Sequence, residues 1–591
     1  MKKFLKFILI FVLVIVLIVG ATVGTVLFIV SDKTNEVEVD KYKEQALQEA
    51  IATPLNDALS KMKDTYSLTL SLTENDINNI IYALIKEKIN PDYNPKTGTT
   101  DKELYVYSGI VLPGSIPVVG GKSVSVNSIY AKLDGDYITL NATANAVGMV
   151  KSRFHVTFKV ETSDNEYRMF ITEAKLGKIN LIGKTAKKAM DKGDTEESLN
   201  DYFKKNNIPF KYIEDDMKLV GTKEEVNNWL IGLLVKENEE GLKKEFVNLL
   251  LSPENDLIAL NSRDNRFELS VDLARLQVSS EDTTLNSEIS KEFNQDVFIQ
   301  GKSQTYIVNC MTGNHTITFT ELEINKLLYS NTNGYSGLGQ SMNLIEGVPF
   351  EFKVDGIIFD INDLTKDCKV TVILNINGLL TTAIVTGAMD DTTGDISINL
   401  DEYVTLGRDF RITSSVITDL MSGAFGSDAI ISFNKETNSL DIKKEIMTNM
   451  LSSAGADGGA KMEVERMVVV ANGIKAYIAY NDTELEATVA DVVSAAEAAL
   501  ANDFVDETQF NTEDEEQQEA VEALMEELSS VSEILSDPEQ ELTEEDADAL
   551  IEAINNLSEE NQQALYEQFA SEIGEEDLQR LYEQMFGGGN N

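Results

Sequence analysis

The sequence predicts an α+β protein with an N-terminal transmembrane helix, two tandem units that each combine a helix with curved antiparallel sheet, and an acidic helical C-terminal tail. Three observations predict this fold class. Residues 69–82 recur as residues 316–329 with six of fourteen positions identical, residues 7–30 carry no charge, and residues 501–591 carry almost only acidic charge. A duplication with so long a period indicates two copies of one domain rather than a solenoid.

Residues 7–30 are predicted to be a transmembrane helix. Lys2, Lys3 and Lys6 precede this run in a short tip, residues 1–6. A helix of 24 residues rises about 36 Å, which is enough to cross a hydrocarbon core of ~30 Å. The alternative is a cleaved signal peptide, whose apolar region is usually only about 7–15 residues long. By the positive-inside rule we expect a single-pass signal-anchor in the cell membrane, with a cytoplasmic N-terminus and an extracytoplasmic C-terminus.

Residues 31–65, between the span and the first unit, are expected to form a mostly helical stalk. Thr53 and Pro54 have the residue types of a helix N-cap followed by proline at the first helical position. The first α+β unit is expected over residues 66–300 and the second over residues 301–485.

Each unit opens with a short strand and a helix. Thr73 with Asp76 in the first copy, and Thr320 with Glu323 in the second, form a helix start signal. Apolar residues follow at spacings of three and four, which indicates one apolar stripe on each helix. The stripes consist of Ile77, Ile80, Ile81 and Leu84 in the first unit and of Ile324, Leu327 and Leu328 in the second.

Long alternating segments follow the helix in both copies. Residues 138–146 and 154–160 in the first unit, and residues 370–376 and 396–400 in the second, alternate apolar with polar side chains. This pattern is typical of antiparallel sheet with one buried face. Further matches keep the same order: Gly148 with Gly378, Gly177 with Gly407, Tyr212 with Phe433, and the turn at 264–265 with the turn at 472–473.

The tail, residues 486–591, is expected to be helical. An amphipathic helix is predicted over residues 521–535, ending before Pro538, and further helices are predicted to start at Thr543, at Ser558 and after Gly574. Short helices of this kind need a partner surface. Residues 501–591 hold 28 Asp and Glu residues against one basic residue, Arg580, and the whole chain has a net charge of −49. This charge excludes the basic footprint of a nucleic-acid-binding protein.

No catalytic motif is present. The chain has two histidines, His155 and His315, each predicted on the polar face of a strand. Nucleophile elbows, phosphate-binding glycine loops and zinc-ligand spacings are missing. We therefore expect a non-enzymatic protein without a cofactor or a metal ion. Residues 390–395 are expected to form a hairpin turn; a calcium site there is the alternative, although the twelve-residue loop pattern is missing.

Cys310 and Cys368 both fall in the second unit on segments predicted to be strands. Outside the membrane they could form a disulfide, and closing that loop would stabilise the fold by roughly 4 kcal/mol. The alternative is that both are small buried hydrophobic residues. Two cysteines alone specify no geometry.

In each unit, the sequence predicts a helix with an apolar stripe next to a sheet with an apolar face. This combination has two interpretations. The simpler is an ordinary core. The second is a groove for an acyl chain, because small residues on the apolar face, such as Ala142 and Ala144, leave room beside the helix. The candidate groove residues are Ile77, Ile80, Ile81, Leu84, Ala142, Ala144, Ile324, Leu327 and Leu328.

The first unit resembles a known family in two places. The helix start with Leu72, Thr73, Ile77 and Asn78, after an N-terminal anchor, resembles the YpmS-like family of anchored bacterial envelope proteins. The stretch Ala174, Leu176, Gly177, Ile179 and Leu181 is similar too. That family looks like the tubular lipid-binding (TULIP) superfamily, and the resemblance implies a helix wrapped by curved sheet around an apolar channel. Family members are usually single-copy and shorter, and the acidic tail has no counterpart among them.

The leading hypothesis is a non-enzymatic carrier or sensor that binds a lipid or a lipid-linked envelope molecule in the groove. Its partners would be the membrane that holds its own span and that ligand. The alternative is an envelope scaffold or assembly protein whose acidic tail, residues 505–591, docks a protein partner.

Overall fold

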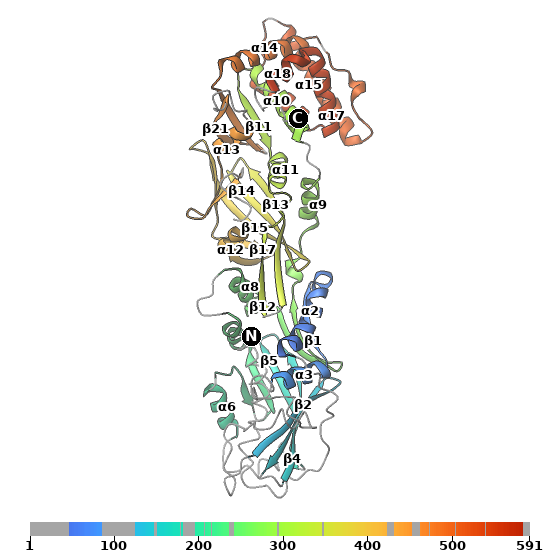
Figure 1. The fold of residues 1–591 in the computed structure, drawn as a ribbon, viewed down its shortest axis with the longest axis vertical. Helices are drawn as coiled ribbons and strands as arrows, with labels where there is room; N and C mark the ends of the chain where they lie inside the picture. The colour runs from blue at the N-terminus through green and yellow to red at the C-terminus, as the bar shows by residue number, and fades with distance from the viewer. Residues whose placement is uncertain are drawn as a thin grey trace.

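The computed structural model describes residues 46–582 except for 85–123, 147–149, 178, 181–194, 206, 214, 236–240, 292–294, 346–347, 422–430, 452–460, 472, 503 and 538. The predicted tip, the predicted transmembrane helix and most of the predicted stalk lie outside these residues. Within the described ranges, no helix is both long and apolar enough to cross a membrane. The described chain is α+β with curled antiparallel sheets, arranged along one long axis with the helical tail at the upper end (Figure 1).

The first unit runs from a leading helix to a closing hairpin. Its elements are α2 (Leu47–Thr65), β1 (Ser67–Leu72), α3 (Glu74–Leu84), β2 (Val124–Asp134), β3 (Tyr137–Ala146), β4 (Val150–Thr162), β5 (Glu166–Leu176), β6 (Ile179–Asn180), α6 (Thr195–Lys205), β7 (Lys211–Ile213), β8 (Lys218–Thr222), α7 (Lys223–Leu234), α8 (Leu242–Leu251), β9 (Ile258–Arg263) and β10 (Arg266–Asp272). A short 3-10 turn, η4 (Ala274–Leu276), and α9 (Ser280–Ile289) connect it to the second unit.

The second unit repeats this plan. Its elements are α10 (Gln295–Met311), β11 (Thr316–Thr320), α11 (Glu321–Asn331), β12 (Gly339–Ile345), β13 (Val348–Asn362), β14 (Asp367–Ile376), β15 (Leu379–Asp390), β16 (Ile396–Leu400), β17 (Tyr403–Leu406), β18 (Phe410–Thr413), α12 (Ser414–Met421), β19 (Ile431–Asn434), β20 (Ser439–Ile442), α13 (Lys444–Leu451), β21 (Met462–Val470) and β22 (Gly473–Tyr480).

The strand order shows the duplication directly. A three-stranded sheet β1-β10-β9 in the first unit corresponds to β11-β22-β21 in the second, with the first strand of each unit paired to its last. The long sheets run β2-β3-β4-β5-β8-β7 and β12-β13-β14-β15-β16-β20-β19. Even a bulge is shared, because the β2–β3 register shifts between Val126 and Ser128 and the β13–β14 register shifts between Val354 and Gly356.

The sequence matches coincide with equivalent positions in this topology. Gly177 and Gly407 each have positive φ, and each donates its N–H at 2.7 Å to a strand carbonyl, that of Arg153 on β4 and that of Thr382 on β15. Tyr212 pairs with Leu219 in the β7–β8 hairpin, as Phe433 pairs with Leu440 in β19–β20. Gly148 lies outside the described residues, so its match to Gly378 is still a prediction.

The leading helix α2 differs from the predicted stalk. It begins at Leu47, and Pro54 lies inside it rather than at its first position. The reason is the buried stripe, because Leu47, Ala50 and Ile51 precede the proline and continue the face formed by the residues after it. Helix α2 packs on β1 and α3, so it is part of the first unit.

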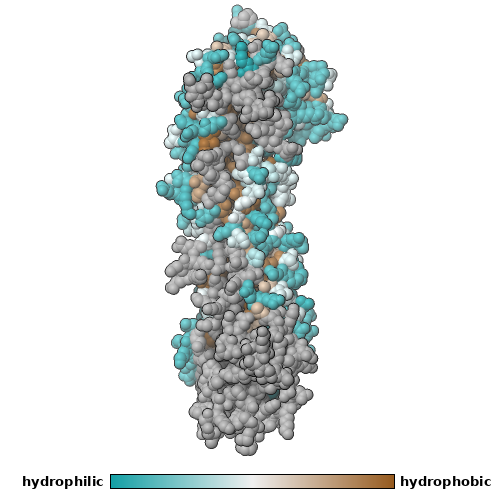
Figure 2. All heavy atoms as spheres, in the orientation of Figure 1, coloured by the Kyte–Doolittle hydropathy of each residue, from teal (hydrophilic) through white to brown (hydrophobic). Residues whose placement is uncertain are grey.

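Helices α14 (Thr483–Leu500), α15 (Glu515–Ser536), α16 (Glu544–Asn555), α17 (Glu559–Ile573) and α18 (Glu575–Tyr582) form the helical tail. The predicted helix starts are confirmed, since the hydroxyls of Thr543 and Ser558 cap α16 and α17 and Gly574 precedes α18. The partner surface is α10, on which α14, α16 and α17 pack. Hydrophilic side chains cover much of the outside of this end (Figure 2).

Candidate functional site

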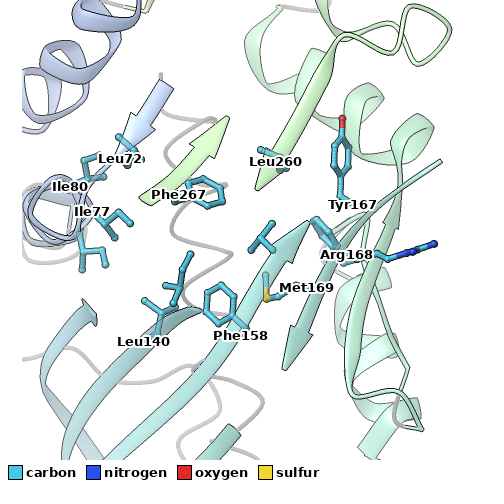
Figure 3. Close-up of a pocket in the computed structure, with 14 residues that line it drawn as sticks. Leu72, Ile77, Ile80, Leu140, Phe158, Tyr167, Arg168, Met169, Leu260 and Phe267 are labelled. Carbon is cyan, nitrogen blue, oxygen red and sulfur yellow. The ribbon is translucent and has the colours of Figure 1, made fainter. Parts of the chain in front are cut away.

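An apolar cavity lies in the first unit between α3, the long sheet and the three-stranded sheet (Figure 3). Its volume is about 120 Å³, and it is partly open to solvent. The lining consists of Leu72, Ile77, Ile80, Ile81, Ile138, Leu140, Phe158, Val160, Tyr167, Arg168, Met169, Phe210, Leu260 and Phe267. An engineered apolar cavity of about 150 Å³ stays dry and binds benzene, so a small hydrocarbon group can fit in a space of this kind.

The cavity wall offers almost no hydrogen-bonding group. Tyr167 and Arg168 are the two lining residues with polar side-chain atoms, and in Figure 3 both polar ends point away from the gathered apolar groups. The Tyr167 hydroxyl donates to Asn227 Oδ1 at 2.8 Å, and Arg168 Nε lies 3.0 Å from Glu166 Oε2. Burial raises the pKa of Tyr167 to about 12, so this hydroxyl keeps its proton. A bound group would be recognised by shape and apolarity alone.

Local structure explains why the predicted stripe reaches the cavity. The Thr73 and Asp76 side chains exchange bonds with each other's backbone N–H at 2.9 and 3.3 Å, so α3 starts where the start signal predicts. Asn78, which is 1% exposed, then holds the helix against β2. Its Oδ1 accepts from the Ala131 N–H at 2.7 Å and its Nδ2 donates to the Ala131 carbonyl at 2.9 Å.

The structure brings three of the predicted groove residues together at this cavity, namely Ile77, Ile80 and Ile81. Leu84 does not line the cavity; it is buried in a cluster that joins α2 residues to Leu72 and Ile80 of the cavity wall. Ala142 is buried on β3 without lining the cavity, and the Ala144 side chain lies outside what the structure describes.

In the second unit the corresponding stripe lies in the packed core. Ile324, Leu327 and Leu328 are 7%, 6% and 2% exposed and belong to the largest apolar cluster. Phe319 replaces the smaller Leu72 at the end of the first strand. By strand register, eight further counterparts of the cavity wall are buried, while Gly387 replaces Phe158 and the partly buried Ser397 replaces Arg168: Cys368, Val370, Met389, Ile396, Ile398, Ile431, Met467 and Ile474. Sequence periodicity could not distinguish a cavity wall from a filled core.

Most of the wall was missed because it comes from strands far away in sequence. Phe158 and Met169 come from the long sheet, and Leu260 and Phe267 come from the closing hairpin. The alternation in residues 154–160 indicated an apolar face, but only the strand pairing shows that this face meets α3.

The two cysteines are free and buried, so the structure contradicts the disulfide interpretation. Cys310 lies in helix α10, not on the predicted strand, while Cys368 lies on β14. Burial raises the pKa of each thiol to about 12, which makes both poor nucleophiles.

The histidines take different positions. His155 is on β4 but is buried rather than on a polar face, and its Nε2 lies 3.2 Å from Glu173 Oε2. His315 is exposed and immediately precedes β11. Among the described residues, no group of three His, Cys, Asp or Glu side chains is placed to hold a metal ion. In the 390–395 turn, Asp390 accepts from the Thr392 N–H, and Asp391 pairs with Lys366.

Comparisons with known proteins give little help. No model of a known protein family matches this chain, and no curated protein matches it either. Among solved structures it is similar to P47 from Clostridium botulinum A2, at 8% identity and a TM-score of 0.15, with 60% of this chain and 88% of that chain covered. At this TM-score the likeness supports no statement about fold or function.

Proposed function

We propose that this protein is a non-enzymatic, single-pass envelope protein whose first unit binds the hydrocarbon part of a lipid or lipid-linked molecule. The apolar cavity beside α3 is the observation that carries the proposal. Burying a methylene group is favourable by about 0.8 kcal/mol. A cavity that compares in size with one that holds benzene takes a stretch of roughly six carbons.

The arrangement of helix and sheet supports the proposal. In the first unit α3 lies against curved antiparallel sheet with the cavity between them. This is the arrangement implied by the resemblance to the YpmS-like and tubular lipid-binding proteins, and we propose that the chain is a tandem relative of them. In the second unit, the described counterparts Ile324, Leu327 and Leu328 are buried in the core.

The order of parts along the chain also fits a lipid source in the anchoring membrane. We propose that residues 7–30 span that membrane. Sixteen residues separate the proposed span from α2, and an extended chain of that length reaches at most about 55 Å. The cavity unit is therefore the described part nearest to the membrane along the chain, and the helical tail is the farthest.

The test is native mass spectrometry with lipid extraction on residues 31–591, purified without detergent. Wild-type protein is expected to carry a stoichiometric lipid. Ile77→Trp should remove it, because Ile77 is only partly buried, lines the cavity, and tryptophan would occupy the space. Leu364→Trp is the matched control. Leu364 is 90% exposed at a hairpin tip, so this substitution adds the same tryptophan side chain away from the cavity.

The lipid content of the wild type and of the two variants distinguishes the lipid-binding proposal from the scaffold alternative. Loss of lipid in Ile77→Trp alone supports the carrier or sensor. A folded wild type without lipid, or equal lipid in both variants, rejects it and favours the scaffold alternative with the tail as the docking element. Ile77 is a better site than Ile80, which is 4% exposed, because a charged or bulky substitution there would also disturb folding.

A further inference from the structure

A cluster of polar side chains lies in the second unit where α10 turns into β11. The His315 Nδ1 atom lies 3.4 Å from Cys310 Sγ and 3.0 Å from the Tyr480 hydroxyl oxygen. The Tyr480 hydroxyl in turn contacts the Tyr306 hydroxyl. A sulfur, a ring nitrogen and two phenol oxygens thus meet at one point, brought together from α10, the loop before β11, and β22.

The duplication allows the residues of this cluster to be compared with their counterparts in the first unit. The offset of 247 residues that aligns the two units places Leu59 at the position of Tyr306 and Leu68 at that of His315. The β1–β10 and β11–β22 registers place Leu273 at the position of Tyr480. Leu59 and Leu273 are 7% and 2% exposed in the core of the first unit. The first unit therefore has leucine at three of these four positions, and the same offset places the exposed Lys63 at the position of Cys310.

We propose that Cys310 Sγ, His315 Nδ1 and the Tyr480 hydroxyl oxygen bind one Zn²⁺-like transition-metal ion. Tetrahedral zinc holds sulfur at ~2.3 Å and nitrogen at ~2.0 Å, which places the two ligand atoms about 3.5 Å apart. The observed separation of 3.4 Å between Sγ and Nδ1 matches this distance. Thiolate and imidazole are also the ligands that favour zinc and copper over calcium and magnesium.

The surroundings suit a bound ion. Tyr306 is 0% exposed and Cys310 is 8% exposed, so little water competes for the ligands. His315 is exposed and provides the route from solvent. The Tyr306 hydroxyl contacts the Tyr480 hydroxyl and supports that ligand. Losing such a supporting group typically weakens metal binding by about 10- to 100-fold.

Metal binding at this cluster must release protons. The ion has to displace the thiol proton, as coordinating metals do. The affinity is therefore expected to rise with pH.

The experiment is a Zn²⁺ and Co²⁺ titration of the full-length, chelator-stripped protein, with excess Mg²⁺ to occupy surface carboxylates. Co²⁺ is expected to give a thiolate-to-cobalt absorption band and tetrahedral visible bands in one equivalent. Cys310→Ser and His315→Gln should abolish the thiolate band, and Tyr306→Phe should weaken Co²⁺ binding by about 10- to 100-fold. Cys368→Ser is the control, because Cys368 is the other free, buried cysteine.

The thiolate-to-cobalt absorption band must remain in the Cys368→Ser control. A thiolate band that persists in Cys310→Ser or that disappears in Cys368→Ser overturns the assignment, and so does a wild type without any band. In that last case the cluster is a hydrogen-bond network. Zn²⁺ should raise the melting temperature of the wild type and not that of His315→Gln. This measurement tests the site independently of the cobalt absorption bands.

Discussion

At the residue scale, the two copies share a buried asparagine with one role. Asn325 bonds both backbone groups of Phe359, accepting from its N–H at 2.8 Å and donating to its carbonyl at 2.9 Å, as Asn78 does with Ala131. One turn earlier, Glu321 Oε2 accepts from the Ile361 N–H at 2.9 Å. In each unit the helix asparagine thus bonds a backbone N–H and a backbone carbonyl on the side of the strand that faces the helix. This shared role explains why asparagine recurs in the aligned segments.

Replacing Asn78 or Asn325 by alanine should lower the free energy of unfolding. Each substitution leaves a buried N–H and a buried carbonyl without a partner, and each unsatisfied group costs about 1–3 kcal/mol. Urea denaturation of both variants measures the loss. Asn75→Ala is the control, because Asn75 is exposed on the same helix α3. A loss no larger than that of the control would contradict the role of the asparagine clamp.

Asp391 gives stability that depends on pH. Its side chain, 11% exposed, accepts from Lys366 Nζ at 2.8 Å and from the Val469 N–H at 3.2 Å. The Lys366 bond lowers the pKa of Asp391 below its usual value. The folded state therefore favours the ionised carboxylate, and its contribution is complete above the unfolded pKa and is lost as the pH falls through the folded pKa.

Asp391→Asn should therefore destabilise the protein most above about pH 5, and the difference from wild type should shrink below about pH 4. Thermal or urea unfolding across this pH range measures it. Asp367→Asn, at an exposed carboxylate on the same hairpin, is the comparison. An Asp391→Asn effect that grows on acidification would have the wrong sign.

At the element scale, tertiary contacts outweigh local signals in α2. Thr53 and Pro54 have the sequence of a helix start, yet the helix runs from Leu47 through the proline. The Thr53 hydroxyl bonds back to the Glu49 carbonyl at 3.0 Å instead of capping. The buried stripe on both sides of Pro54 supplies enough packing to offset the missing hydrogen bond.

Pro54→Ala should raise the free energy of unfolding. An internal proline costs roughly 3 kcal/mol through its missing N–H and its clash with the preceding turn, and a gain of about 1–3 kcal/mol is expected because the native helix has already adapted. Thermal and urea unfolding measure the change. A decrease would show that the proline ring makes contacts worth more than the restored bond.

The corresponding helices α3 and α11 differ in what surrounds them. Ile77 lines a cavity, whereas its counterpart Ile324 is packed in the core. Ile77→Phe should therefore change stability little. Ile324→Phe should cost about 1–3 kcal/mol, because overpacking forces side chains out of their preferred rotamers. Equal costs in a urea comparison of the two variants would show that the cavity cannot accept added atoms.

At the scale of the whole molecule, one apolar core runs through both units into the tail. A single cluster contains Met62 from α2, Phe350 from β13 and Phe569 from α17. At the joint between the units, the Phe246 ring on α8 lies 5.1 Å from the Phe350 ring and 5.2 Å from the Phe352 ring. The acidic tail also meets a basic residue, since Lys475 lies 3.5 Å from Glu544 and 3.6 Å from Asp548.

Deleting residues 505–591 should therefore do more than remove a docking element. It would expose apolar residues of α10 and α14, among them Val308 and Leu500, that pack against the tail helices. We expect dye binding to exposed apolar surface, self-association and a lower melting temperature. A chain ending at residue 582 is the control, because it keeps the described tail helices. A deletion variant that stays monomeric and as stable as this control would show that the tail is an independent module.

The sequence by itself determined the duplication, the α+β class, the apolar stripes and the starts of the tail helices, because each depends on residues close together in the chain. The tertiary structure alone decided that one stripe borders a cavity and the other a filled core, that α2 continues through Pro54, and that Cys310 lies on a helix beside His315 and Tyr480. These outcomes depend on side chains supplied by distant strands. Periodicity shows which face of an element is buried, but only packing shows what that face meets.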